Sequence, residues 1–274
     1  MVIRPLGVED VPACLDLAAD RDWPRDEAKW RLLLNAGQGW GIDSPHGGLA
    51  ASTVVMPYDR AAAIGMVLVA ARHGGHGLGR RLTEHALATI GDVPAVLYAT
   101  AMGFPLYEKL GFRVTGRVTK HIGHWRGAAG RPGPVVRAAE AADWSGILHR
   151  DHTVFGADRA KLLDRYAQAA EVVVAEPDAY GHGGHAFAFP GDEVLFIGPV
   201  SADTDAVAWA LVAHLAAGRD LPVRVDVTAG HPWLAGLLVD HGLRPRRPDP
   251  LMTHGPDLPT DWSAYQAITL QSLG

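Results

Sequence analysis

The predicted secondary structure of this 274-residue chain repeats once, and the repeat constrains the fold more than any single motif does. Strands and helices are expected in the order β-α-α-β-β-β-α-β-α-β up to about residue 125, and the second half returns to that order. Residues 126–134 form the best linker, since they are rich in Gly and Pro and lack bulky apolar side chains. We therefore predict an α/β fold of two tandem domains, 1–128 and 134–274.

The composition limits the possible partners. Lys and Arg number 25 and Asp and Glu number 30, so the formal net charge of −5 disfavours a nucleic-acid-binding protein. Gly, Pro or charged residues interrupt the apolar runs well before the ~20 residues that a membrane span needs. The first residues, Met1 to Leu6, lack the charged-then-apolar order of a signal peptide. We expect a cytoplasmic protein that binds neither nucleic acid nor membranes.

Cysteine and histidine chemistry is not expected to carry the function. The one cysteine, Cys14, falls on the inward face of an expected helix, where a buried thiol is the ordinary case. Among 14 histidines, His182 and His185 have a spacing that can chelate, but a metal site needs three or four convergent ligands. We therefore expect no metal.

The strongest local feature is a glycine-rich turn between an apolar strand and a helix, within residues 67–82. Its glycines are Gly74, Gly75, Gly77 and Gly79. Such a turn permits positive φ and points several backbone N–H groups at one spot beside a helix N-terminus, which favours a pyrophosphate. Arg80 and Arg81 stand where a P-loop needs Lys-Ser/Thr, and the glycine spacing differs from that of a dinucleotide-binding turn. A surface turn without a ligand stays open as an alternative.

With this turn, the sequence resembles the GNAT superfamily of acetyl-CoA-dependent N-acetyltransferases, whose motif is Arg/Gln-x-x-Gly-x-Gly/Ala after an apolar strand. Gly77 and Gly79 fill the two small positions, while Gly74 departs from the Arg/Gln position. A register that starts at Arg72 also satisfies the motif, although the run from Gly77 into the helix favours the first register. A second family segment is resembled by Leu106-Tyr107-Glu108-Lys109-Leu110-Gly111-Phe112.

The resemblance implies two GNAT-like domains, each a mixed, mostly antiparallel sheet flanked by helices, with acetyl-CoA as cosubstrate. It also implies that the fourth and fifth strands of the first domain splay apart and that the pantetheine arm pairs with the fourth. The residues that would hold the cosubstrate are Val67, Leu68, Val69, Gly74, Gly75, His76, Gly77, Leu78, Gly79, Arg80 and Thr100. Many family members carry Asn where Thr100 stands.

The same resemblance implies direct attack of a neutral amine on the thioester, with no covalent enzyme intermediate. Tyr107 would be the general acid that protonates the departing thiolate, and the alternative is a tyrosine that only packs its ring. No general base is assigned. The candidates left open are Asp22, Glu27, Asp59 and His124.

The second half is expected to be a degenerate copy. Its segment corresponding to the glycine turn, residues 197–205, has no glycine turn, and Asp203 and Asp205 would repel a pyrophosphate. Such a domain can still shape a substrate pocket. Weak substrate candidates are Trp23, Asp158, Arg159 and Asp226. For Asp158 we favour the simpler interpretation of a carboxylate at a helix N-terminus.

These observations favour an N-acetyltransferase that acts on a primary amine of a small molecule. The alternatives are a protein or peptide acetyltransferase and a non-catalytic acyl-CoA sensor, and the intact Tyr107 argues against the sensor. A homodimer is left open.

Overall fold

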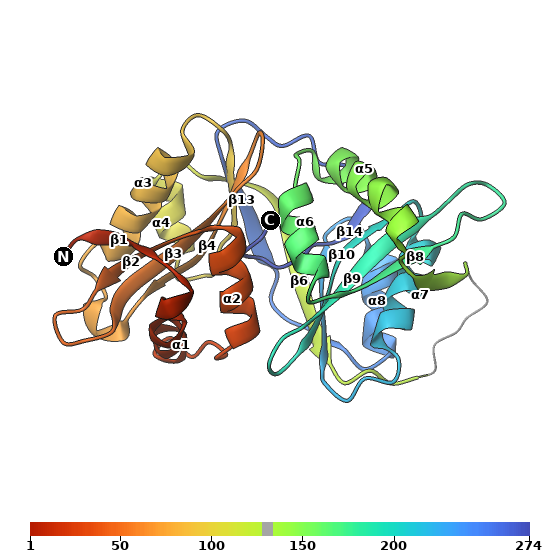
Figure 1. Cartoon of the computed structure of the whole chain (residues 1–274), viewed down its shortest axis with the longest axis horizontal. Helices are drawn as coiled ribbons and strands as arrows, with labels where there is room; N and C mark the ends of the chain where they lie inside the picture. Colours follow the sequence, from red (N-terminus) through yellow and green to blue (C-terminus); the bar gives the residue numbers. More distant parts are fainter. Residues whose placement is uncertain (128–133) are drawn as a thin grey trace.

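The computed structural model describes residues 1–127 and 134–274, and its two halves share one continuous sheet (Figure 1). The strands of the first half are β1 (Ile3–Leu6), β2 (Gln38–Asp43), β3 (Leu49–Pro57), β4 (Ala62–Val69), β5 (Ala95–Tyr98) and β6 (Arg113–Gly123). Its helices are α1 (Val11–Ala19), α2 (Glu27–Ala36), α3 (Leu78–Ile90) and α4 (Phe104–Lys109).

The second half has the same alternation of strands and helices. Its strands are β7 (Val136–Ala138), β8 (Glu171–Ala175), β9 (Gly184–Pro190), β10 (Leu195–Ala202), β11 (Val223–Thr228), β12 (Arg244–Pro245), β13 (Asp249–His254) and β14 (Tyr265–Ala267). Its helices are α5 (Trp144–Phe155), α6 (Ala160–Ala167), α7 (Asp205–Ala216) and α8 (Pro232–Asp240).

The sheet is mixed and mostly antiparallel, as predicted. Its order is β1-β2-β3-β4-β5-β13-β6-β11-β14-β10-β9-β8-β7. Only the pairs β4–β5 and β10–β11 are parallel among the described strands. These two parallel pairs occupy the same position in each half, which is where the fourth and fifth strands of each copy were expected.

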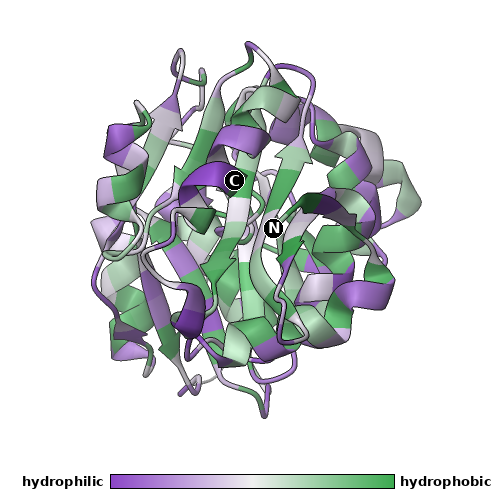
Figure 2. Ribbon diagram, turned by 90° about the vertical axis from the view of Figure 1, so that its left-hand side faces the viewer, coloured by the Kyte–Doolittle hydropathy of each residue, from purple (hydrophilic) through white to green (hydrophobic). Residues whose placement is uncertain are grey.

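Alternation along β3 explains why helices cover both faces of the first half. Val54 and Met56 belong to the core beneath α1 and α2, whereas Val55 between them packs with residues under α3 and α4. Successive strand residues point to opposite faces, so a nearly continuous apolar strand such as β3 indicates a sheet buried on both sides. Figure 2 shows hydrophobic residues concentrated on the central strands and hydrophilic ones on outer helices and loops.

The largest core joins the two halves. It contains Leu33 of α2 together with Leu162 and Tyr166 of α6, all of them buried. The halves are therefore packed against each other through apolar side chains as well as through the sheet.

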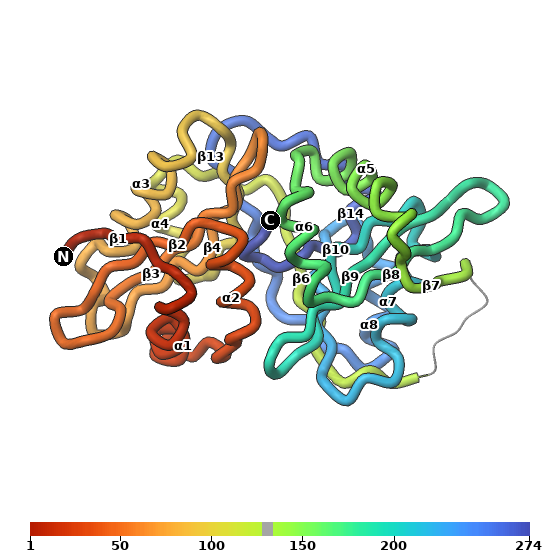
Figure 3. The backbone as a smooth tube through the Cα atoms, viewed as in Figure 1, coloured from red at the N-terminus to blue at the C-terminus, as the bar shows by residue number. Residues whose placement is uncertain are grey.

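Strand β13 interlocks the halves further. Although it lies late in the chain, β13 pairs with β5 on one side, with Leu251 opposite Tyr98, and with β6 on the other. Figure 3 shows this blue C-terminal segment among the elements of the first half, with the C-terminus ending between the halves. The expected order closes the second half with a strand, but it does not predict that this strand inserts into the sheet of the first half. The boundaries 1–128 and 134–274 stay a prediction, and residues 128–133 of the expected linker lie outside the described residues.

Candidate active site

The edge of β4 is open beyond its first two residues. Strands β4 and β5 pair only at Ala62 with Ala95 and at Ala63 with Val96, after which β5 turns away to pair with β13. The remainder of β4, to Val69, has no strand partner on that side among the described residues. Unpaired backbone groups at a strand edge accept an added extended segment readily. This gap has the form expected for the strand-like arm of a cosubstrate.

A β-bulge redirects the backbone of β4 beside this gap. The register between β3 and β4 shifts between Ser52 and Val54, and Met66 opposite the shift has a φ of +52°. Two hydroxyls of β3 hold the carbonyls there, since Ser52 donates to Met66 O at 3.0 Å and Thr53 donates to Gly65 O at 3.3 Å. A non-glycine residue at positive φ costs about 1–3 kcal/mol, and such strain is concentrated at functional sites.

The glycine turn leads from β4 directly into α3. Gly75 and Gly77 have φ of +77° and +73°, and a Cβ added to either would meet nothing within 4 Å. The backbone amides of residues 75–80 donate to no other described group, and Gly77 gives α3 no side-chain cap. Unsatisfied N–H groups at a helix start favour an anion. Open space and free donors thus fit a pyrophosphate at this turn.

The second half closes the corresponding turn with its own side chains. Helix α7 follows β10 after two residues, and the Thr204 hydroxyl accepts from Val207 N at 3.2 Å as its N-cap. The Asp203 carboxylate accepts from Gly183 N and from Arg150. A helix start that is capped by a side chain and flanked by carboxylates offers fewer free donors to a phosphate and repels its charge.

The strand gap of the second half is also filled by the chain itself. Strand β14 pairs antiparallel with β10, placing Val200 opposite Ala267, and it pairs with β11 as well. Ile268 then approaches β10 so closely that a Cβ added to Gly198 would lie 1.9 Å from Ile268 O. The edge of β10 that corresponds to the open edge of β4 is therefore occupied by β14.

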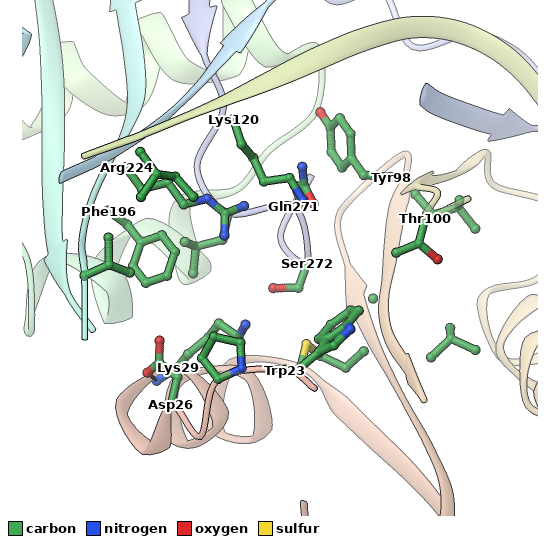
Figure 4. A pocket seen from close by; sticks show the side chains of 18 of the residues that line it. Trp23, Asp26, Lys29, Tyr98, Thr100, Lys120, Phe196, Arg224, Gln271 and Ser272 are labelled. Carbon is green, nitrogen blue, oxygen red and sulfur yellow. Dashed lines mark hydrogen bonds between the residues drawn. The ribbon is translucent and has the colours of Figure 1, made fainter. Parts of the chain in front are cut away.

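A cavity of about 480 Å³ opens from the gap beside β4 toward the second half. Residues of the first half in its wall include Trp23, Lys29, Val67, Tyr98, Thr100, Tyr107 and Lys120. The second half contributes Phe196, Arg224 and the C-terminal residues Leu270, Gln271 and Ser272. Figure 4 shows these side chains surrounding one space, with Trp23 and Lys29 on one side and Arg224 on the other.

Tyr107 is held against the cavity by α4 and its neighbours. The tyrosine is buried, its ring makes an edge contact with Phe112 at 5.8 Å between centroids, and burial raises the pKa of its phenol to about 12. Gly103 leaves room for the ring, because a Cβ there would lie 2.8 Å from Tyr107 Cε2. At neutral pH, Tyr107 is a protonated hydroxyl beside the open edge of β4.

The remaining residues predicted for the cosubstrate lie along the same path. Val67 and Thr100 line the cavity, and the Thr100 hydroxyl accepts from Gly103 N at 3.2 Å. The exposed Arg80 pairs with Glu84 at 2.8 Å along α3, so its side chain follows the helix. Arg72 is held elsewhere, donating to Ser44 and to Gly47 O.

The four substrate candidates lie in different surroundings, and only one of them lines the cavity. Trp23 lines the cavity, while Asp158 is exposed and accepts from Ala160 N at the start of α6. The structure contradicts a substrate contact for Arg159, which is fully buried and donates to Asp151, Tyr265 and Thr269. Asp226 is 4% exposed and lies behind Arg224, which donates to it at 2.7 and 2.6 Å. Arg159 and Asp226 are therefore structural or positioning groups, because their polar atoms are already engaged.

None of the four candidates for a general base lines the cavity, and those candidates were Asp22, Glu27, Asp59 and His124. Sequence reasoning missed Lys29, Lys120 and Arg224, because they come from separate segments and form no motif. It also missed the close approach at Gly65, where an added Cβ would lie 2.7 Å from Ser272 Cβ. A glycine inside an apolar strand is the one sequence signal that could have indicated it.

In residues 1–127 and 134–274, no three His, Cys, Asp or Glu side chains come together as metal ligands. His182 contacts Asp178 at the surface, whereas His185 is buried in the second half. Across the same ranges, no helix combines the length and apolar character of a membrane span. Cys14 is buried, which raises the pKa of its thiol to about 12.

Comparisons with known proteins agree with this geometry. The family model for an acetyltransferase (GNAT) domain matches residues 147–265, within the second half. The chain is 27% identical to YitH, an uncharacterized N-acetyltransferase of Bacillus subtilis (strain 168), over 273 residues that cover 98% of this chain and 97% of YitH.

Two solved structures share the fold over nearly the full length. A putative acetyltransferase from Pyrococcus horikoshii has a TM-score of 0.83 at 19% identity and covers 100% of this chain and 95% of that one. A tandem GNAT protein from the clavulanic acid biosynthesis pathway has a TM-score of 0.63 at 15% identity, covering 93% and 99%.

The fold, the open turn and these relatives define the class as acyltransferases that use acyl-CoA. The family model identifies a GNAT acetyltransferase domain within the second half, and the similarity to YitH and to a tandem GNAT structure extends over nearly the whole chain, which confirms the resemblance stated from the sequence.

Proposed function

We propose that the chain transfers the acetyl group of acetyl-CoA to a primary amine of a small molecule, by direct attack of the neutral amine. The observation that carries the proposal is the single cavity that joins the free edge of β4 and Tyr107 to side chains of the second half. Its volume of about 480 Å³ lies within the usual range of about 300–1,000 Å³ for small-molecule sites. A protein acceptor would be better served by a long surface groove.

The cosubstrate supplies an activated acyl group, and the chain positions it. The amides of residues 75–80 would bind the pyrophosphate, while the free edge of β4 at Val67, Leu68 and Val69 would pair with the pantetheine arm. Backbone N–H groups at this edge are suited to stabilise negative charge that develops on the reacting carbonyl oxygen. The bulge at Met66 supports this role, because it redirects the backbone at that point.

Tyr107 is the residue that would donate a proton to the departing thiolate. With a pKa of about 12, its buried phenol keeps its proton at neutral pH and can act as a hydrogen-bond donor. The second half would act as a wall of the acceptor pocket. Counting back from the positive-φ glycine after each helix, Leu238 stands where Tyr107 stands in the first half.

Thiol release from acetyl-CoA, measured with a panel of primary amines, tests the proposal. Release that depends on one class of small amine would support it. Release only with peptides would favour the protein acetyltransferase. No release, together with a rise in melting temperature on adding acetyl-CoA, would favour a sensor. The absence of both release and a rise in melting temperature would contradict the assignment of the glycine turn.

A further inference from the structure

The cavity contains a lysine whose amine has no partner in the described part of the chain. Lys29 lies in the first turn of α2, where Asp26 caps the helix by accepting from Lys29 N at 2.9 Å. Its half-buried side chain enters the cavity (Figure 4), and the amine makes no ion pair or hydrogen bond with any described residue. Burial lowers the pKa of this amine to about 8, with Arg224 and Lys120 lowering it and Asp26 and Asp226 raising it.

A second cation faces Lys29 from the other half of the molecule. Arg224 on β11 donates through Nε and Nη2 to the two oxygens of Asp226, which orients the guanidinium. Its Nη1 donates to no group in the described part of the chain, and Phe196 lies 5.2 Å from Cζ. Arginine held on one edge can still bind an anion through the other.

Three of the nearby acidic groups are already engaged, and the fourth, Glu193, lines the cavity but forms no ion pair with Lys29 among the described residues. Asp226 binds Arg224, and Asp249 binds Lys120 at 2.8 Å and accepts from Gln271. Asp26 caps α2. An uncompensated ammonium in a partly desolvated cavity is unfavourable, and a bound anion would supply the missing charge.

We propose, on the basis of the function proposed above, that the acceptor carries a carboxylate or phosphate besides its amine, and that Lys29 and Arg224 bind this anion from opposite sides. Thr100, near the open edge of β4, lies across the cavity from Arg224 (Figure 4). The acceptor would therefore be oriented with its amine toward β4 and its anion toward the second half. Such an arrangement makes the second half a specificity element, since Arg224 belongs to it.

Matched acceptors test the inference through activity. The pairs are 4-aminobutyrate against n-butylamine and glucosamine 6-phosphate against glucosamine, which separate a carboxylate from a phosphate. We expect kcat/KM to favour the anionic member of at least one pair by about tenfold or more, as for a charge-assisted contact. Lys29→Met should remove most of this preference and Lys29→Arg should retain part of it, whereas Lys161→Met on the exposed face of α6 should leave it unchanged.

A pH titration of the lysine amines, with and without the probes, tests the inference without requiring enzyme turnover. The chain has four lysines, Lys29, Lys109, Lys120 and Lys161, so each amine can be followed separately by NMR after isotopic labelling. Binding of either anionic probe should raise the pKa of Lys29 from about 8 toward the ordinary value of about 10.4, and the neutral probes should not.

The outcomes separate the two proposals. Equal acetylation of both members of each pair would overturn the anionic acceptor while leaving the transferase function standing. A Lys29 amine that titrates identically with and without both anionic probes would also overturn it. If no amine is acetylated but the anionic probes raise the Lys29 pKa, the anion site stands and the transfer to small amines fails.

Discussion

The two halves of this protein repeat one arrangement of strands and helices, but they differ at one corresponding place, where the fourth strand leads into the following helix. In the first half, α3 begins at Leu78 after the N-cap Gly77, and among the described residues no side chain caps it and no strand pairs with the edge of β4 beyond Ala63. In the second, Thr204 caps α7 and β14 fills the edge of β10. The same backbone groups are thus left for a ligand in one copy and satisfied by the chain in the other.

The comparison teaches that a shared topology does not decide which copy binds acyl-CoA. The family model matches the second half, which is the copy with the closed turn. What differs is the group that pairs with the backbone at a strand edge and at a helix start. Backbone N–H and C=O groups there need a hydrogen-bond partner when they are buried. The predictions below each test one feature of the two halves, in order of decreasing effect.

The largest effect is expected where the C-terminal segment passes a strand glycine in each half. Gly198→Ala places a Cβ 1.9 Å from Ile268 O, whereas Gly65→Ala meets Ser272 at 2.7 Å. We expect Gly198→Ala to lower the free energy of unfolding by about 3–5 kcal/mol and Gly65→Ala by about 1–3 kcal/mol. Denaturant unfolding measures both, and equal or negligible losses would contradict the close packing of this segment against β10.

Gly77→Asp should make the first half resemble the second. A carboxylate at the start of α3 would accept from the free amides and repel a pyrophosphate, so we expect acetyl-CoA to bind at least about 100-fold more weakly. Gly218→Asp is the control, since Gly218 also has a positive φ, +69°, and open space but lies far along the chain after α7. Calorimetry measures the affinity, and unchanged binding would remove the glycine turn from the site.

Tyr107→Phe should make the first half resemble the second at the acid position. Loss of the hydroxyl is expected to lower kcat by about 100-fold, while acetyl-CoA binds as before because the ring is kept. Tyr180→Phe, in an exposed loop of the second half, provides the control. Steady-state kinetics with thiol detection measure the effect, and wild-type turnover would mean that Tyr107 only packs.

The smallest effect is a pH dependence confined to the second half. His185 is 1% exposed, its Nε2 has no partner among the described residues, and burial lowers its pKa from 6.5 to about 4. Because the folded-state pKa lies below the unfolded one, the unfolded state binds more protons between these pH values. Stability therefore falls as pH drops, by about 2 kcal/mol between pH 6.5 and pH 5.

Unfolding of the wild type and of two leucine variants at several pH values measures this effect. His185→Leu should remove that part of the acid sensitivity, and His149→Leu, at an exposed position of α5, should retain it. An identical pH profile for the wild type and His185→Leu would show that the buried histidine does not titrate as described.

Most elements could be predicted from the sequence because their signals are local. The apolar run of β4, the glycines before α3 and the glycine after α4 mark strand, turn and helix end within a few residues of each other. Strands β12 and β14 lie outside the expected order. β12 has only two residues and β14 only three, so neither carries a clear alternation.

The candidate site, too, could be predicted only where its signals are local. Periodicity indicated the class of fold, and the glycine turn and the segment around Tyr107 carried the family resemblance that implied the use of acyl-CoA, because each depends on neighbours in the chain. The acceptor pocket depended on tertiary structure, since Lys29 and Arg224 meet only after β6 and β11 join the two halves. The sequence likewise could not show that β13 crosses into the first half or that β14 closes the second, because strand pairing between distant segments is decided by packing in three dimensions rather than by local preference.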